Sequence, residues 1–119
     1  MIVVDTSVWI DHLRRPDEAL SRHIAEAVVA IHPLVIEEIA CGHLQHRTRV
    51  LSELAKLPMA PVASHDEILH FIERHRLGGS GLGPVDVHLL ASAHLAHALL
   101  FSRDAALNRA ATTLGISAA

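Results

Sequence analysis

Cysteine is nearly absent from this chain, and long apolar runs are missing altogether. The only thiol belongs to Cys41, so no internal disulfide can form, and we expect the protein to work in a reducing compartment. No apolar run reaches the roughly 18 residues that a membrane-spanning helix needs. The amino terminus also lacks the basic stretch and cleavage site of a secretory signal. The sequence therefore predicts a cytoplasmic protein with no membrane partner.

A strong basic excess is missing as well. The formal net charge is -3 when the 11 histidines are neutral, so the charge of the chain rises on mild acidification. A nucleic-acid partner would not be attracted by such an overall charge. Any such partner would have to be held by local arginines or by metal ions.

Apolar residues, in contrast, are abundant for a chain of this size. The 119 residues fit one domain by the usual size range, and we assign residues 1–119 to it. Half of the residues are hydrophobic, and the mean hydropathy is +0.33, which is high for a small monomer. We interpret the surplus as a buried partner surface, most simply that of a homodimer.

Short apolar segments alternate with longer segments of helical periodicity along the whole chain. Strands are expected at 2–4, 28–31 and 98–101, with a weak strand between Pro58 and Pro61. Strands that are apolar throughout are typical of a parallel sheet covered on both faces. Helices are expected at 7–14, 17–27, 33–42, 47–57, 65–77, 84–97 and 105–114. The fold class is therefore α/β, with three layers and helices on both faces of a parallel central sheet.

An acid follows the first strand directly. Asp5 comes after the β-branched run at 2–4, so it lies at the carboxyl edge of the sheet, where open α/β folds place their ligands. Thr6 and Ser7 suit the turn into the next helix. The alternative is that Asp5 only caps that helix, as acids at such junctions often do.

Two further aspartates are expected at the same edge. Asp86 lies in the first turn of the helix after GLGP, and this helix leads into the strand at 98–101. Asp104 follows that strand after two residues. If the strand pairs with the first one, Asp5, Asp86 and Asp104 meet. Each of the two also suits the amino end of its helix, so either one taken alone has a structural explanation.

A fourth carboxylate could reach this edge from the other side. Glu37 and Glu38 lie about one turn into the helix after the second strand, and periodicity does not choose between them. Several carboxylates at one edge repel each other and raise each other's pKa unless a cation lies among them. Oxygen ligands of this kind suit Mg²⁺ or Mn²⁺, which polarise a phosphoryl oxygen and lower the pKa of an attacking water.

Other metal and phosphate sites fit the sequence less well. His88, His94 and His97 are spaced six and three residues apart, and neither they nor Cys41 form part of a complete zinc ligand set in the sequence. The glycine-rich stretch GGSGLG follows a helix and lacks the lysine of a phosphate-binding loop. Trp9 fits a core or partner contact better than a platform for stacking bases.

Two other enzyme classes would use acids at strand ends. A phosphoacceptor receiver domain needs a lysine after its last strand, but the only lysine is Lys56, within a helix. A haloacid-dehalogenase-type phosphatase needs a second aspartate two residues after the first, where Ser7 stands. Both classes are therefore disfavoured.

Four segments in this order resemble a known family. VDTSVWID, IEEIACG, GLGPVDVHLLASA and LLFSRDAAL together are similar to the motifs of PIN-domain ribonucleases, and more closely to VapC-type toxins of bacterial toxin-antitoxin pairs. The resemblance extends over essentially the whole chain. It implies a PIN-like fold with the α/β layers described above.

The resemblance also implies which residues form the site. Carried over by position, the metal-binding and catalytic acids of the family fall on Asp5, Glu38, Asp86 and Asp104. The supporting hydroxyls fall on Thr6 and on Ser102, where the family more often has threonine. Beside the last acid, Arg103 is our candidate for a contact with substrate phosphate.

The activity implied by the resemblance is that of an endoribonuclease dependent on Mg²⁺ or Mn²⁺, which leaves a 5′ phosphate and a 3′ hydroxyl. The partners implied are an RNA substrate, a second copy of the chain, and a cognate VapB-type antitoxin whose tail places a basic residue against the acids. A catalytically inactive PIN fold that only binds a partner is the alternative. The complete set of acids argues against it.

Overall fold

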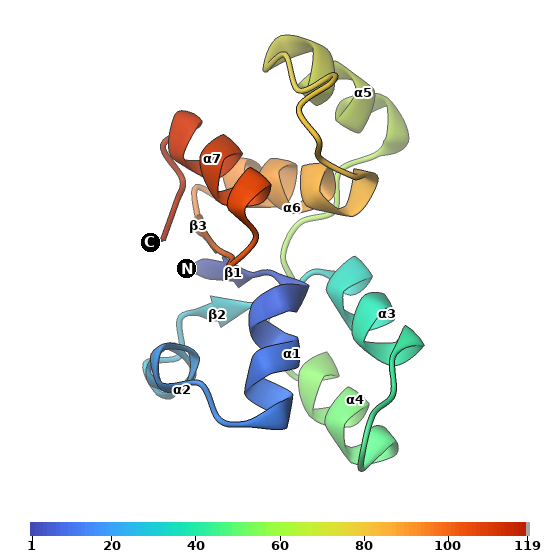
Figure 1. Ribbon diagram of the computed structural model, residues 1–119, viewed down its shortest axis with the longest axis vertical. Coiled ribbons are helices and arrows are strands. Elements are labelled where there is room, and N and C mark those ends of the chain that lie inside the picture. Colours follow the sequence, from blue (N-terminus) through green and yellow to red (C-terminus); the bar gives the residue numbers. More distant parts are fainter. Residues whose placement is uncertain (119) are drawn as a thin grey trace.

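The computed structural model describes residues 1–118, and within them a sheet of three parallel strands forms the centre (Figure 1). The strands are β1 (Ile2–Val4), β2 (Val29–Ala30) and β3 (Leu99–Phe101), in the order β2-β1-β3. In this register Ile2 lies opposite Val29 on one side and Leu99 on the other. The expected pairing of the first and last strands is therefore confirmed, with the first strand in the middle.

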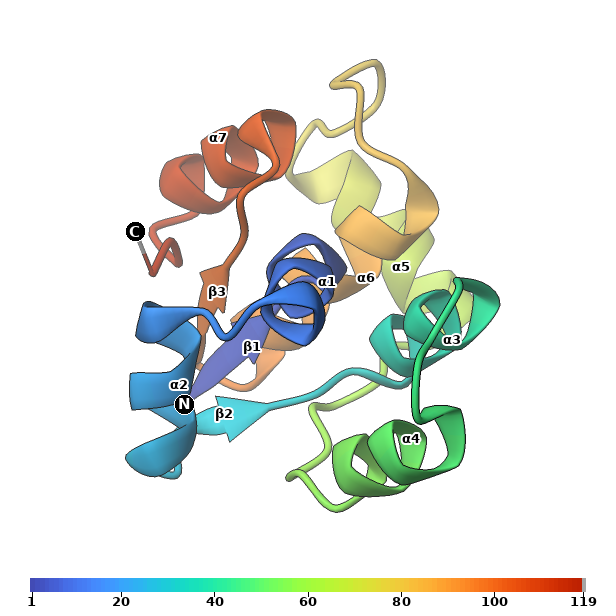
Figure 2. The same ribbon diagram turned by 60° about the horizontal axis from the view of Figure 1, so that its bottom comes forward.

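Helices cover both faces of the sheet. In Figure 1, α5, α6 and α7 lie on one side of the strands, and α1, α2, α3 and α4 lie on the other. Figure 2 shows the same separation from another direction, with β1 running between α1 and α6. The expected three-layer α/β architecture is confirmed. The helices are α1 (Thr6–Arg14), α2 (Glu18–Ala25), α3 (Pro33–Cys41), α4 (Arg47–Ala55), α5 (His65–Arg74), α6 (Pro84–Leu95) and α7 (Ala105–Thr113).

Two short backbone pairings extend the sheet at its edges. Ile31 forms a parallel bridge with Met59, so the weak strand expected between the two prolines is reduced to a single bridge. Leu100 forms a second bridge with Ser117, which the sequence pattern did not predict. Because these pairings use backbone groups on both outer strands, the sheet presents less open edge for pairing with other chains.

Most helices end one to three residues earlier than the sequence pattern predicts, and three of them are followed by a left-handed residue that is not glycine. Ala27, Arg76 and His97 adopt left-handed backbone conformations, with φ of 57°, 54° and 51°, just after the ends of α2, α5 and α6. In each case the next residue donates its N–H to a carbonyl five residues back, for example Ala98 to Ala93 at 2.9 Å. This is the usual left-handed helix ending, which glycine favours. None of the three residues is glycine, so no stop signal is visible in the sequence at these positions.

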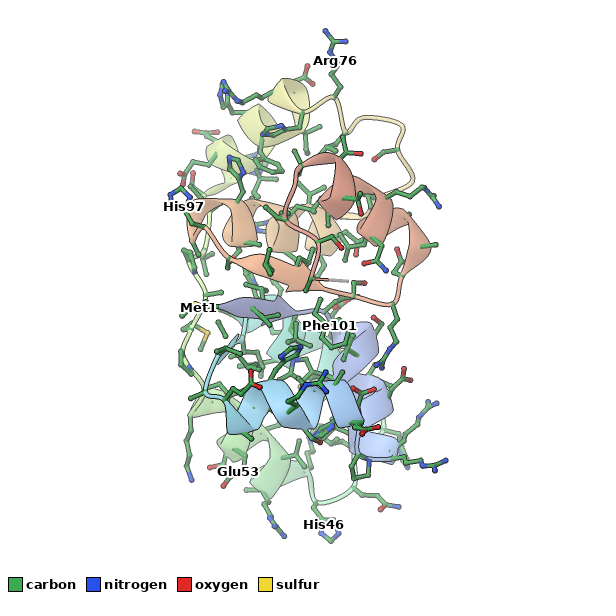
Figure 3. The ribbon with its side chains drawn as sticks, turned by 90° about the vertical axis from the view of Figure 1, so that its left-hand side faces the viewer. Met1, His46, Glu53, Arg76, His97 and Phe101 are labelled. Carbon is green, nitrogen blue, oxygen red and sulfur yellow. The ribbon has the colours of Figure 1, made fainter. Side chains whose placement is uncertain are left out.

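The core lies between the sheet and its two helical layers. Val3 and Val4 are completely buried, as expected for a strand covered on both faces. Trp9 is also buried, which supports its reading as a core side chain. The molecule measures 40 × 25 × 23 Å, and in Figure 3 Arg76 and His46 mark the two ends of its long axis. Among the described helices, none is long and apolar enough to cross a membrane.

Candidate functional site

Asp5 lies where β1 ends, with only 6% of its surface exposed. Its backbone N–H donates to the carbonyl of Phe101 at 2.9 Å, which continues the pairing of β1 with β3. Asp5 occupies the position before the first residue of α1, but its carboxylate makes no capping hydrogen bond to that helix. Instead, Oδ2 accepts hydrogen bonds from Ser7 Oγ at 2.7 Å and Ser102 Oγ at 2.8 Å. The simple capping role is therefore excluded for this acid.

Ser102 connects the first acid to the last one. Its hydroxyl donates to Asp5 and accepts a hydrogen bond from the backbone N–H of Asp104 at 3.0 Å. The side chain of Asp104 then caps α7, because Oδ2 accepts from the N–H of Leu107 at 2.9 Å. Asn108, one turn further on, donates its side-chain amide to the Ser102 carbonyl at 2.9 Å. The turn after β3 is thus held by hydrogen bonds to Asp5 on one side and to α7 on the other.

Asp86 reaches the same edge from the first turn of α6. Its Oδ2 accepts a hydrogen bond from the N–H of Gly83 at 3.0 Å. Burial raises the pKa of this carboxyl above its usual value, the Gly83 N–H opposes that shift, and the charges of Asp5 and Asp104 raise the pKa further. The three aspartates are therefore close enough to repel one another, as their positions in the sequence predict.

Glu38 stands on the opposite side of this edge, on α3. The buried hydroxyl of Thr6 donates to Glu38 Oε1 at 2.5 Å and so connects α1 with α3. The structure thus places Glu38 against the residue that follows Asp5, a placement that periodicity alone left open between it and Glu37. The glutamate itself is exposed, so its carboxylate is accessible from solvent.

Arg103 points away from this group of acids. Its guanidinium forms ion pairs with Asp17 and, at 3.4 Å, with Asp11, and it lies over the ring of Phe101 at 5.4 Å from the centroid. The Leu20 N–H and then Arg103 hold the pKa of Asp17 below its usual value. The structure therefore brings this arginine to α1 and the start of α2, and the expected phosphate contact would compete with two carboxylates.

The donor set at this edge suits a hard divalent cation. Within residues 1–118, no three His, Cys, Asp or Glu side chains lie close enough together to hold a metal ion in their present positions. The chemistry still fits, because burial and then the charges of Asp5 and Asp104 raise the pKa of Asp86, and the guanidinium of Arg103 is paired with Asp17. Carboxylate oxygens are the ligands that Mg²⁺ and Mn²⁺ prefer.

Two residues of this network were not predicted as site residues. Ser7 donates to Asp5 from two positions further along the chain, a local pattern typical of serine beside an acid. Asn108 lies four residues after Asp104 and hence on the same face of α7. Spacing could have indicated both residues, but only the structure shows which atoms they hold.

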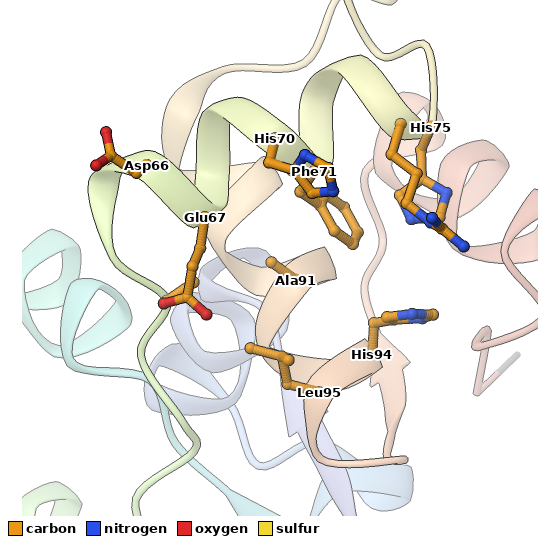
Figure 4. Close-up of a pocket in the computed structure, with 10 residues that line it drawn as sticks. Asp66, Glu67, His70, Phe71, His75, Ala91, His94 and Leu95 are labelled. Carbon is orange, nitrogen blue, oxygen red and sulfur yellow. The ribbon is translucent and has the colours of Figure 1, made fainter.

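Two of the grooves formed by residues 1–118 bear on partner binding, and one of them includes Glu38. The first, which we call the Glu38 groove, has a volume of about 600 Å³ between α1, α3 and α4, and is lined by Ile10, Leu13, Arg14, Glu38, Ile39, Gly42, His43, Leu44, Gln45, His46 and Val50. The second, the α5–α6 groove, has a volume of about 410 Å³. Figure 4 shows Phe71, Ala91 and Leu95 around this second groove, with His75 and His94 facing each other at one end.

Comparisons with known proteins agree with this geometry. The family model of the PIN domain matches residues 2–112. The chain is 47% identical over 120 residues to Ribonuclease VapC32 of Mycobacterium tuberculosis, in strains CDC 1551 / Oshkosh and H37Rv. This alignment covers 100% of the chain and 97% of the relative.

Solved structures share the fold at lower sequence identity. FitAcB from Neisseria gonorrhoeae matches with a TM-score of 0.64 and 21% identity, covering 94% of each chain. PAE2754 from Pyrobaculum aerophilum matches with a TM-score of 0.62 and 18% identity, covering 95% of this chain and 85% of the other. The family match and the full-length identity together show that the chain belongs to the PIN-domain family, among the VapC-type ribonucleases.

Proposed function

We propose that residues 1–119 form one endoribonuclease domain, the toxin of a toxin-antitoxin pair, which cleaves RNA with the help of Mg²⁺ or Mn²⁺. The observation that carries the proposal is the approach of three aspartates from separate elements; burial first, and then the charges of Asp5 and Asp104, raise the pKa of Asp86. The 47% identity to a ribonuclease over the full chain supports the same activity. A single free thiol, Cys41, fits the reducing cytoplasm in which we place the protein.

In this proposal Asp5, Glu38, Asp86 and Asp104 hold the cation. When bound there, a divalent ion supplies polarisation of the phosphoryl oxygen and a lower pKa for the attacking water, so that hydrolysis leaves a 5′ phosphate and a 3′ hydroxyl. The protein contributes the placement of its carboxylates.

Each carboxylate is oriented by hydrogen bonds from the protein, two by hydroxyls and two by backbone N–H groups. The hydroxyls of Ser7 and Ser102 fix Asp5, and Thr6 fixes Glu38. Asp86 and Asp104 are oriented by backbone N–H groups at the amino ends of their own helices. These contacts reduce the reorganisation that binding a cation requires.

We assign the Glu38 groove to the antitoxin. Its lining includes the apolar side chains of Ile10, Leu13, Ile39, Leu44 and Val50 together with Glu38, so a segment seated in the groove would contact this acid. The family resemblance implies an antitoxin tail that places a basic residue there. Such a residue would neutralise the crowded carboxylates in place of the metal, which explains how binding would inhibit cleavage.

We assign the α5–α6 groove to a second copy of the chain. Leu95 lines this groove and remains 50% exposed, although it is apolar. Asp66 lies at the amino end of α5 and Arg74 at its carboxyl end. If α5 packs antiparallel to its counterpart across a twofold axis, Asp66 meets Arg74 of the other copy, and the same pair forms twice. The surplus hydropathy of the chain fits this burial.

The activity is tested by incubating total RNA with purified protein in Mn²⁺, in Mg²⁺, in EDTA, and with Asp5→Asn as the matched isosteric control. We expect discrete fragments that require both the metal and Asp5, and mapping of their 5′ phosphates identifies the target. Absence of cleavage by folded, antitoxin-free protein on total and ribosomal RNA would favour an inactive binding domain.

The dimer is tested by sedimentation of Asp66→Arg and Arg74→Asp. Each variant alone places like charges opposite each other and should shift the protein to monomer. A mixture of the two should form a heterodimer, because both contacts are then of opposite charge. A mixture that stays monomeric would contradict this arrangement of α5. Leu95→Glu, which places a charge in the groove, tests whether the groove itself is the contact surface.

A further inference from the structure

An unpaired arginine lies in the same groove as one of the proposed metal ligands. The lining of the Glu38 groove includes Arg14, the last residue of α1, together with Glu38. Arg14 is exposed, and within residues 1–118 no hydrogen bond or ion pair involves its side chain. Its charge is therefore free for a ligand, whereas the charge of Arg103 is paired with Asp11 and Asp17.

The groove extends along α1, away from the end of that helix that contacts Glu38. Thr6, the first residue of α1, donates to Glu38, and Glu38 lines the groove. Ile10, Leu13 and Arg14 line it from the second half of the same helix. At about 1.5 Å per residue, α1 rises about 12 Å between Thr6 and Arg14. A polymer lying along this helix therefore reaches from Glu38 to a free cation.

The helix on the opposite wall, α3, is held at both of its ends. At its start, the buried His32 accepts a hydrogen bond through Nδ1 from the Leu34 N–H at 3.0 Å. Burial, and then the charge of His88, lowers the pKa of His32 to about 4, so the ring stays neutral and keeps this cap near pH 7. At the other end, Arg47 donates to the carbonyl of Ala40 at 2.6 Å and connects α3 with α4.

The loop between α3 and α4 adds two imidazole rings to the groove. His43, Gln45 and His46 line it there, and within residues 1–118 neither histidine ring has a hydrogen-bond partner. Unpaired bases of RNA stack on imidazole rings as well as on larger aromatic side chains. In Figure 3, His46 marks one end of the long axis of the molecule, so a strand that leaves the groove there enters solvent.

The charges of the chain make a cation at this place important for an RNA ligand. The net charge of -3 and the acids at the sheet edge repel a phosphate backbone. The guanidinium of Arg14 offers paired N–H donors that match two phosphate oxygens. Grooves that bind single strands combine such cations with flat or apolar faces for the bases. The Glu38 groove has both kinds of side chain in its lining.

We propose that the Glu38 groove receives a single-stranded segment of RNA next to the cleaved bond, and that Arg14 holds a backbone phosphate of this segment. The position of the cleaved bond rests on the proposed function. A volume of about 600 Å³ is in the range of sites for small molecules, so the groove admits a short single strand but not a duplex. Because the antitoxin is assigned to the same groove, RNA and antitoxin exclude each other there.

The test measures RNA binding in the absence of cleavage. Asp86→Asn protein in EDTA serves as the background, and fluorescence anisotropy reports its binding to a labelled single-stranded RNA of random sequence. Adding Arg14→Met should weaken binding about tenfold, the effect of losing one charged hydrogen bond. The slope of log affinity against log salt concentration should decrease by about 0.7, the value for one phosphate contact with a single strand.

Arg15→Met is the matched control. Arg15 is the next residue and is also exposed, its side chain has no hydrogen bond or ion pair within residues 1–118, and it is not part of the groove lining. Its substitution should leave RNA affinity unchanged. Arg14→Lys keeps the charge and should retain most of the affinity. The Tm should be the same in all these variants, because neither arginine side chain is paired in the folded protein.

Three results would overturn the proposal. Equal losses of affinity in Arg14→Met and Arg15→Met would show a general effect of charge. Unchanged affinity in Arg14→Met would leave the groove to the antitoxin alone. Duplex RNA that binds as tightly as the single strand would contradict the substrate class.

Kinetics of the active protein separate this proposal from the proposed function. With total RNA as substrate, Arg14→Met should raise KM about tenfold and leave kcat unchanged, because the four acids are intact. A lower kcat with an unchanged KM would contradict a phosphate contact. If the wild type cleaves no RNA but binds it through Arg14, the proposed nuclease activity fails and the assignment of the groove to RNA remains.

Discussion

The carboxyl edge of the sheet and the α5–α6 groove are built in different ways. At the edge, each aspartate is held by a hydroxyl or a backbone N–H, and like charges are kept close together. In the groove, the exposed Leu95 lies on α6 beside His94, His94 faces His75 just after the end of α5, and His75 Nε2 is buried without a partner in residues 1–118. The carboxylates at the edge are thus held in place by the protein's own hydrogen bonds, whereas the groove keeps an apolar side chain exposed and a ring nitrogen unpaired.

The largest effect should come from Asp86→Asn. Asparagine keeps an oxygen for the Gly83 N–H but removes the charge, so we expect RNA cleavage to fall by about a thousandfold or more, the scale of losing one essential electrostatic group. The Tm should not fall, because one of three mutually repelling carboxylates is gone. Leu95→Glu, in the groove, should leave cleavage by each chain near the wild-type rate. Cleavage lost in Leu95→Glu and kept in Asp86→Asn would reverse the comparison.

Acidification should destabilise the protein through His32. Its pKa is lowered from 6.5 in the unfolded chain to about 4 in the folded state, so between these values the unfolded chain binds more protons. Stability is therefore unaffected above pH 6.5 and falls as the pH drops toward 4, by roughly 3 kcal/mol at most.

Urea unfolding of the wild type and of His32→Asn between pH 5 and pH 7.5 checks this pH dependence. The difference in the free energy of unfolding between wild type and His32→Asn should change across this pH range. In the groove, burial and the charges of His94, Arg74 and His70 also lower the pKa of His75, so His75→Gln should show a change of the same sign. Parallel curves for His32→Asn and wild type would contradict the assignment.

Divalent metal should stabilise the edge and leave the groove unaffected. At a Mn²⁺ concentration 100 times the dissociation constant, the free energy of unfolding should rise by about 2.7 kcal/mol. Thermal melts should show this gain in Leu95→Glu, and lose most of it in Asp86→Asn. A Tm that does not respond to millimolar Mn²⁺ or Mg²⁺ would argue against a metal site at this edge.

The smallest effect is expected for Arg103→Met. Its ion pairs with Asp11 and Asp17 are partly exposed, so their loss should lower the free energy of unfolding by less than about 1 kcal/mol. Because the guanidinium lies away from the acids, the KM for RNA should be unchanged. A raised KM with normal stability would restore this arginine as a phosphate contact.

The sequence was sufficient for the parts of the site that depend on topology. Asp5 directly follows β1, Asp104 lies three positions after the end of β3, and Asp86 lies in the first turn of the helix that leads into β3, so a parallel sheet brings them to one edge. The fourth acid was harder to assign from the sequence, because two adjacent glutamates, Glu37 and Glu38, fit the same turn of the helix. The family resemblance pointed to one of them, and the Thr6 contact agrees.

The remaining features depend on contacts that no local pattern specifies. Arg103 meets partners 92 and 86 residues earlier in the chain, which diverts it from the acids. The left-handed residues that end α2, α5 and α6 are Ala, Arg and His, which carry no signal for such a turn. The pairing of Leu100 with Ser117 likewise depends on the folded sheet.

The hydrogen bond between Ser102 and Asp5 joins positions that are 97 residues apart, and this separation affects when the site can form during synthesis. At 5–20 residues per second, a ribosome takes roughly 5 to 20 s to pass from the first acid to the serine that holds it. Through that time a nascent chain has neither its Asp104 carboxylate nor β3. A toxin with this topology becomes active only near the end of its own translation, because β1 must pair with β3, which is synthesised near the end of the chain.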